Sequence, residues 1–118
     1  AAGLLAMAGL GPDALEGGAH WPKNDSAITA LAATGAQPSA LHNNCSGKHS
    51  GMLTMNQHLK GDAEYTEVDH PLQVQIKQAF EEVTDETSAG WGVDGCSAPN
   101  FACSLHGLAR ARRFCSWF

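Results

Sequence analysis

The sequence predicts a mixed α/β chain that is mostly helical and carries few short strands. Apolar residues recur at helical spacing in several segments, whereas β-branched and aromatic residues are sparse. No convincing alternating run of four or more residues is present. The strand-poor pattern, an apolar start and an apolar tail over residues 114–118 together predict a partial single domain over residues 1–118, an internal fragment of a larger chain.

The composition excludes several classes of function. The net charge of −5 argues against a nucleic-acid binder, which usually presents a basic face. No apolar run approaches the roughly 20 residues that span a bilayer, so no membrane partner is expected. The four cysteines form no C-x-x-C pair and nothing predicts a disulfide framework, so free thiols are expected, and free thiols favour a cytoplasmic protein.

Two helices and a strand are expected in the first part of the chain. Residues 1–10 form a helical stripe that ends at the break of Gly11 and Pro12. Asn24 or Asp25 can cap a short helix from Ser26 to about residue 34. In residues 36–44, we expect a short strand near Leu41.

Three helices and a second strand are expected further on. A helix over about 46–60 is predicted to bury Met52, Met55 and Leu59, and Gly61 is its expected C-cap. Asp69 is expected to cap the next helix, whose apolar stripe consists of Leu72, Ile76, Ala79, Phe80 and Val83. A short strand is expected at Val93, and a last helix begins near 101 or 102 with Leu105, Leu108 and Ala109 facing inward.

Polar and chemically reactive residues concentrate in two segments, 41–51 and 91–100. Cys45 and Lys48 lie three residues apart at a helix N-terminus, where the dipole and the ammonium favour a thiolate. If the segments meet, Cys45, Lys48 and Cys96 supply two sulfurs and a nitrogen, a plausible zinc environment, with Asp94 beside it. Two buried structural cysteines remain the simpler alternative.

A second interpretation of the first segment is nucleophilic catalysis by cysteine. His49 lies four residues after Cys45, on the same side of a helix, and could serve as its base. In the simplest alternative, His49 and His42 only satisfy local backbone groups.

Both segments resemble the signatures of a known family. Residues 42–53, His-Asn-Asn-Cys-Ser-Gly-Lys-His-Ser-Gly-Met-Leu, resemble the first signature of the Rhizobium etli-type L-asparaginases, the asparaginase II family. Residues 91–102, Trp-Gly-Val-Asp-Gly-Cys-Ser-Ala-Pro-Asn-Phe-Ala, look like the second signature. Two long motifs in the right order are far more specific than one short pattern. The resemblance covers about residues 1–109, and the tail 110–118 departs from it.

The resemblance implies hydrolysis of the small molecule L-asparagine to L-aspartate and ammonia, on a fold similar to serine β-lactamases and glutaminases. The family's zinc ligands match Cys45, Lys48 and Cys96. Asp94 matches an aspartate that contacts the substrate or the zinc-bound water, and His49 matches a histidine of the same pocket. Members tend to be dimers, so a homodimer is allowed for the full-length form.

The acylating residues that the resemblance implies lie outside this sequence. The family's nucleophile is a serine in a Ser-x-x-Lys motif, and no Ser or Thr here precedes a Lys by three residues. No catalytic residue is therefore assignable, and the chain alone is expected to be inactive. The alternative is a non-catalytic metal- or ligand-binding domain derived from the same fold.

Overall fold

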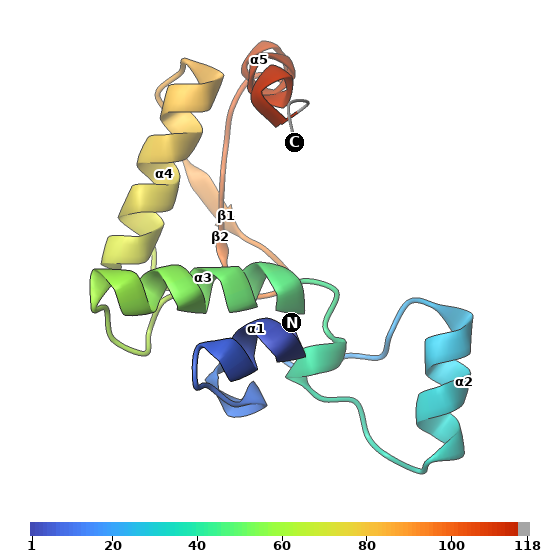
Figure 1. Ribbon diagram of the computed structural model, residues 1–118. Helices are drawn as coiled ribbons and strands as arrows, with labels where there is room; N and C mark the ends of the chain where they lie inside the picture. The colour runs from blue at the N-terminus through green and yellow to red at the C-terminus, as the bar shows by residue number, and fades with distance from the viewer. Residues whose placement is uncertain (116–118) are drawn as a thin grey trace.

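A central helix organises the chain in the computed structural model, which describes residues 1–115, with side chains to residue 113. Helices α1 and α4 pack against α3, and α5 packs against α4 (Figure 1). The mostly helical, mixed α/β class that the sequence predicts is confirmed. The elements in order are α1 (Ala2–Met7), η1 (Pro12–Ala14), α2 (Asp25–Ala33), η2 (Ala40–His42), α3 (Ser46–Leu59), α4 (Pro71–Thr84), β1 (Trp91–Val93), β2 (Pro99–Phe101) and α5 (Leu105–Cys115).

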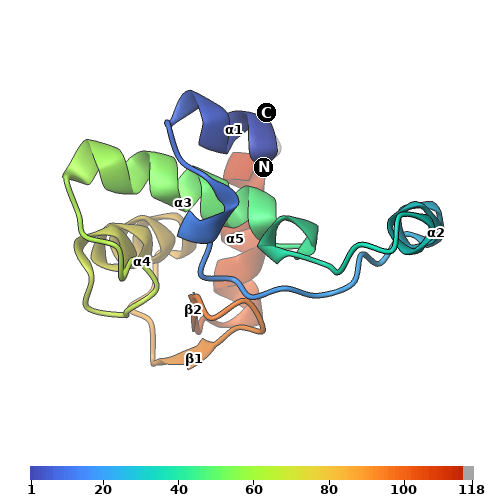
Figure 2. The ribbon, with the colours of Figure 1, turned by 90° about the horizontal axis from the view of Figure 1, so that it is seen from below.

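Helix α2 stands apart from the rest of the molecule. Its predicted cap is present, because the Asn24 side chain accepts hydrogen bonds from the backbone N–H groups of Ser26 and Ala27. None of its own residues is buried, and Figures 1 and 2 both show it joined to the rest of the molecule by two extended segments of chain. The radius of gyration of 16.0 Å accordingly exceeds the roughly 13.5 Å of a compact chain of this length.

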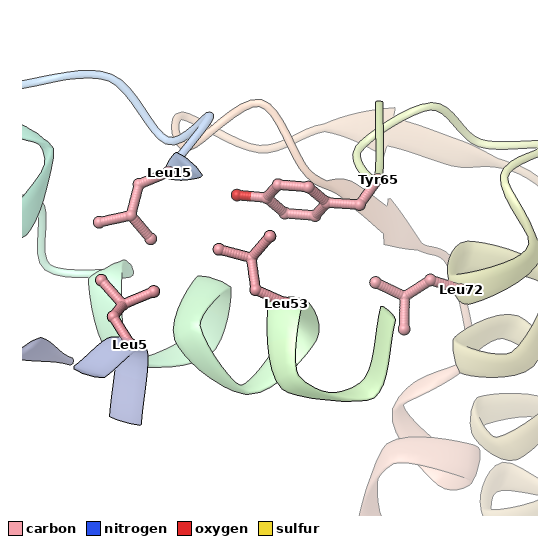
Figure 3. Packing of buried hydrophobic residues seen from close by; sticks show 5 residues of the cluster. All are labelled: Leu5, Leu15, Leu53, Tyr65 and Leu72. Carbon is pink, nitrogen blue, oxygen red and sulfur yellow. The ribbon is translucent and has the colours of Figure 1, made fainter. Parts of the chain in front are cut away.

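A small apolar core lies between α1, α3 and the start of α4. Figure 3 shows its buried members, which are Leu5, Leu15, Leu53, Tyr65 and Leu72. Tyr65 comes from the loop between α3 and α4, and its ring lies over α3. Within residues 1–115, no helix combines the length and the apolar character that crossing a membrane requires.

The buried face of α3 is largely polar; of the expected apolar stripe, Met52 and Leu59 are partly buried against the core, and only Met55 is wrong. His49, Ser50, Leu53 and Asn56 are buried, whereas Met55 is 42% exposed. The predicted C-cap is also displaced by one residue, because Lys60 rather than Gly61 takes the left-handed conformation, with a φ of 56°. Gly61 instead lies against the buried side chains of Asn56 and His70. This close approach leaves no room for a Cβ, which explains why a glycine follows the turn residue.

Three other local expectations are wrong. The segment near Leu41 forms the 3₁₀ helix η2 rather than a strand. His70 rather than Asp69 caps α4, because its ring Nδ1 accepts from the backbone N–H of Leu72 at 3.0 Å. The residues expected to face inward on the last helix are instead exposed: Leu105, Leu108 and Ala109.

Strands β1 and β2 form an antiparallel hairpin. The register pairs Trp91 with Phe101 and Val93 with Pro99. The strand expected at Val93 is therefore confirmed, and its partner β2 was not anticipated. Residues 94–98 connect the strands, and 94–97 form a turn in which Ser97 N–H donates to the Asp94 carbonyl at 3.0 Å and Ser97 has a φ of 71°. This turn carries the second predicted cysteine segment.

Candidate metal centre

Asn43 fixes the entry to α3, and with it Cys45. Its buried side chain accepts from the Cys45 backbone N–H at 2.8 Å and donates to the carbonyls of Gly17 and Gly18. Cys45 is the N-cap residue of α3 and is half-buried. Lys48 follows in the first turn of the helix, so both side chains start from one end of a rigid element.

The β1–β2 turn positions the other half of the site. Asp94 is held by its own backbone N–H donating to Ala98 at 2.9 Å and by its side chain accepting from the Gly95 N–H at 2.7 Å. The buried Cys96 thiol donates to Asp94 Oδ2 at 3.5 Å. The two side chains therefore share one face of the turn, as their spacing predicts.

The two segments meet. Cys45 Sγ, Cys96 Sγ and a carboxylate oxygen of Asp94 lie within 4.8 Å of one another. Lys48 Nζ donates to Asp94 Oδ2 at 3.0 Å. The structure thus brings together all three residues that the resemblance implies as zinc ligands, and Asp94 beside them.

Lys48 and Asp94 form an ion pair at the mouth of this cluster, with side chains 40% and 38% exposed. The hydrogen bond from Lys48 lowers the pKa of Asp94, and the Gly95 N–H adds to this effect. Burial lowers the pKa of Lys48, but hydrogen bonds to Cys96 and Asp94 outweigh burial and raise it. Without a metal, the amine therefore stays protonated.

Cys45 does not have the lowered pKa that its place at a helix N-terminus suggests. Burial raises the pKa of this thiol, and its interaction with Cys96 raises it further, while the Lys48 charge opposes both only in part. The expected thiolate is thus not favoured in the metal-free protein. A neutral thiol is a poor nucleophile, whereas a bound dication would remove its proton.

The donor set fits zinc. In a tetrahedral site, bonds of about 2.3 Å to sulfur and about 2.1 Å to nitrogen or oxygen place the donor atoms roughly 3.3–3.8 Å apart. The observed cluster needs only small side-chain movements to reach that spacing, because its donor atoms already lie within 4.8 Å. Two thiols with a nitrogen or a carboxylate are ligands that zinc accepts, whereas magnesium and calcium prefer oxygen alone.

His49 lies beneath this cluster rather than at its surface. The ring is 1% exposed, and Nδ1 is 2.7 Å from the Tyr65 hydroxyl. Burial and the Lys48 charge lower the pKa of His49. His49 is therefore neutral, and its Nδ1 pairs with Tyr65 rather than with the Cys45 thiol, so the geometry does not favour the cysteine–histidine pair considered above.

Comparison with known proteins agrees with both signature segments. The profile of the family described as L-asparaginase II matches residues 1–116. The chain belongs to the L-asparaginase II family. A search of curated proteins gave no match. Family membership supports an amidohydrolase acting on a small molecule such as asparagine, and the cluster of two cysteines and an aspartate lies within the matched residues.

The sequence did not predict the structural roles of two residues near the site in this L-asparaginase II family chain. Asn43 lies inside the first signature, but the sequence does not reveal that its amide reaches back to Gly17 and Gly18. Tyr65 lies in a loop that reads as polar, and its only signal was being the single tyrosine of the chain. Cys103 is half-buried in the connection to α5 and takes no part in the cluster.

Proposed function

We propose that the chain is the zinc-site part of a Rhizobium etli-type L-asparaginase, which hydrolyses L-asparagine to L-aspartate and ammonia. The observation that carries the proposal is the meeting of the two signature segments. Two thiols separated by 50 residues of chain gather with Asp94, and Lys48 binds that carboxylate. Cys45, Lys48 and Cys96 are the proposed zinc ligands.

Asp94 is the proposed contact for the substrate. Its carboxylate is partly exposed at the mouth of the cluster, where it can accept hydrogen bonds from the ammonium group of an amino acid. Zinc, when bound, supplies positive charge that stabilises negative charge developing on a reacting amide. In this proposal Lys48 gives up its ion pair with Asp94 on binding zinc, which frees the carboxylate for the substrate.

Zinc titration of cysteine variants tests the ligand set. One zinc per chain is expected, with binding lost in Cys45→Ser and in Cys96→Ser. Cys103→Ser is the matched control, because Cys103 is also a free thiol but lies outside the cluster. Equal binding by all three variants and the parent chain contradicts the proposal.

Proton release distinguishes Lys48 from Asp94 as the third protein ligand. Binding by two thiols and an amine releases three protons, whereas two thiols and a carboxylate release two. Calorimetric titrations at pH 7 in buffers of different ionisation enthalpy count these protons. We expect three, and a count of two would assign the place to Asp94 and leave Lys48 as its ion-pair partner.

Activity measurements separate the enzyme from its alternatives. The 118-residue chain alone should release no detectable ammonia from asparagine, since loss of a covalent nucleophile costs several orders of magnitude in rate. Ammonia release that Cys45→Ala abolishes would support the cysteine-nucleophile alternative. A longer chain that supplies the Ser-x-x-Lys motif should be active. If it binds zinc without activity, the non-catalytic alternative is favoured.

Asp94→Ala in that longer, active chain tests the substrate contact. Turnover should fall strongly while the fold and the bound zinc stay mostly intact. Asp25→Ala, which removes an exposed carboxylate from the isolated helix α2, is the control and should leave turnover unchanged. Unchanged turnover in Asp94→Ala would place this residue among the ordinary turn aspartates.

A further inference from the structure

The buried side chain of Asn43 ties together two segments that adjoin the cysteine cluster. Its Oδ1 accepts a hydrogen bond from the Cys45 backbone N–H at 2.8 Å. Its Nδ2 donates to the backbone carbonyl of Gly17, and also to that of Gly18 at 3.1 Å. Asn43 is 5% exposed, so water competes little for these bonds. The amide therefore joins the residue that carries the first thiol to a distant part of the chain.

The three bonds leave the amide a single orientation. The carbonyls of Gly17 and Gly18 require donors, whereas the Cys45 N–H requires an acceptor. Turning the amide over would place an oxygen against two oxygens and an NH2 group against an N–H group. Buried groups left unpaired in this way are costly, so the amide keeps the orientation in which all its partners are satisfied.

The Cys45 backbone is held from two sides as a result. Its N–H donates to the Asn43 side chain, and its carbonyl accepts from the His49 N–H at 3.0 Å in the first turn of α3. A cysteine carries its sulfur one rotatable bond away from the backbone, so the direction of the thiol follows from this fixed frame. Asn43 therefore bears on where Cys45 Sγ lies, although its amide binds backbone groups.

The segment 17–20 gives this amide a buried support. Gly17 is itself buried, and a Cβ there would lie 3.7 Å from Asn43 Nδ2, so the two residues are closely packed. Further along the segment, His20 Nε2 lies 2.7 Å from Asn44 Oδ1. The segment is thus fastened to both residues that precede the N-cap of α3.

We propose that Asn43 is a positioning residue for the thiol pair, and that its amide holds the Cys45 backbone so that this thiol meets the thiol of Cys96. Asn43 acts through Cys45, because its two donors and its acceptor are engaged by backbone partners. The consequence for zinc rests on the proposed function, whereas the consequence for the two thiols does not.

Asn43→Ala removes the amide, and phenylarsine oxide measures the result without zinc. This trivalent arsenical binds two neighbouring thiols together, and Cys103→Ser with Cys115→Ser in every chain leaves it only the pair. Its affinity should fall about tenfold in Asn43→Ala, as metal affinity does when residues that orient the ligands are lost.

Asn56→Ala is the matched control. Asn56 is 6% exposed and also binds a backbone carbonyl, that of Asp62 at 2.6 Å. It lies about 16 Å from Cys45 along the axis of α3, at a rise of about 1.5 Å per residue. Arsenical affinity should stay within about twofold of the parent, because sites this far apart are usually independent in energy.

Rescue by serine separates positioning from stability. Asn43→Ser keeps a side-chain oxygen that accepts from the Cys45 N–H, but it is too short to reach the glycine carbonyls. It should bind the arsenical within about threefold of the parent chain, although its stability falls with that of Asn43→Ala. NMR couplings that report χ1 of Cys45 should show one rotamer in the parent chain and in Asn43→Ser, but averaging in Asn43→Ala.

The glycine support offers a test that leaves Asn43 in place. Gly18 and Gly35 both have a φ of 67°, and among residues 1–113 an added Cβ meets nothing within 4 Å at either position. Alanine is therefore strained alike at both, but of the two only Gly18 offers its carbonyl to Asn43. Gly18→Ala should weaken arsenical binding about threefold, near the low end of the effect of one hydrogen bond, and Gly35→Ala should not.

The outcomes distinguish this proposal from the proposed function. If the parent chain binds the arsenical but no zinc, the zinc proposal fails while the arsenical series still decides the role of Asn43. That role is overturned if Asn43→Ala binds the arsenical as tightly as Asn56→Ala, or if Asn43→Ser binds as weakly as Asn43→Ala. If Asn43→Ala fails to fold, the two glycine variants decide, and equal affinities in them overturn the role.

Discussion

Gly61→Ala should destabilise the chain, although glycine-to-alanine changes outside left-handed turns usually stabilise. A Cβ at this position would lie 2.7 Å from Cε1 and 2.9 Å from Nε2 of His70, and closer still to Oδ1 of Asn56. Neither side chain can move freely. Asn56 donates to the Asp62 carbonyl at 2.6 Å, and His70 caps α4.

The expected loss in the free energy of unfolding follows from the interactions that must break or strain to make room for the added Cβ. Loss of the Asn56 hydrogen bond or of the His70 cap costs about 1 kcal/mol. Overpacking strain adds about 1–3 kcal/mol, and the lower entropy of the unfolded alanine chain returns about 0.4–1 kcal/mol. The net loss is about 2 kcal/mol. For a domain of this size, that lowers the melting temperature by roughly 8 °C.

Urea unfolding followed by circular dichroism measures the change, and Gly51→Ala is the matched control. Gly51 is exposed in the middle of α3, and within residues 1–113 no tertiary neighbour lies within 4 Å of an added Cβ. That variant should be more stable than the parent by about 0.5–1 kcal/mol. If Gly61→Ala is as stable as the parent chain, the close packing of this glycine is refuted.

Three further outcomes are expected. Hydrogen bonds from Ser104 lower the pKa of Glu86 in the folded chain. Glu86 therefore stabilises the fold above the pKa that it has in the unfolded chain, and this effect is lost as pH falls through the lower folded pKa. In urea unfolding, the difference in the free energy of unfolding between the parent chain and Glu86→Gln should accordingly close in acid. Asn24→Ala removes the α2 cap at a local cost of about 1 kcal/mol. Amide exchange should therefore speed up over residues 25–34, while the global unfolding midpoint stays unchanged because no residue of α2 is fully buried. Zinc affinity, measured by competition with a chelator, should fall at least tenfold for each unit that pH drops between 8 and 6. The reason is that the pKa of Cys45 is raised, so this thiol must release a full proton when it binds zinc. An affinity independent of pH would contradict thiol ligation.

Local signals in the sequence were sufficient where neighbouring residues decide the structure. The Asn24 cap, the boundaries of α3 and the helix after Pro71 follow from side chains that act within one turn. The expected faces of helices were less reliable, because tertiary contacts decide them. Leu105 and Leu108 have helical spacing, yet both are exposed on α5.

The site could be assembled from sequence only in part. Spacing placed Cys45 beside Lys48 and Asp94 beside Cys96, because each pair lies within one local element. Whether the two pairs meet depends on the packing of the hairpin against α3, which no local pattern encodes. The family resemblance supplied that expectation, and the distances between the cysteine and aspartate side chains agree with it.

The polar face of α3 explains how the mostly polar loop between α3 and α4 is held in place. Apolar packing anchors the segment 61–70 only at Tyr65, the one core residue that it supplies. Buried side chains bind its backbone instead: Asn56 holds the Asp62 carbonyl, and Gln73 holds that of Tyr65 at 2.7 Å.

Each of these buried bonds costs about 1–3 kcal/mol if one partner is left unsatisfied, so together they allow this loop few alternative conformations. Tyr65 is thereby held where its hydroxyl can reach both Glu16 and His49. A helix with an ordinary apolar stripe could bury as much surface, but it would offer no donors to fix the loop. The buried polar residues of α3, which a hydrophobic pattern does not reveal, therefore help to hold in place the loop that carries Tyr65.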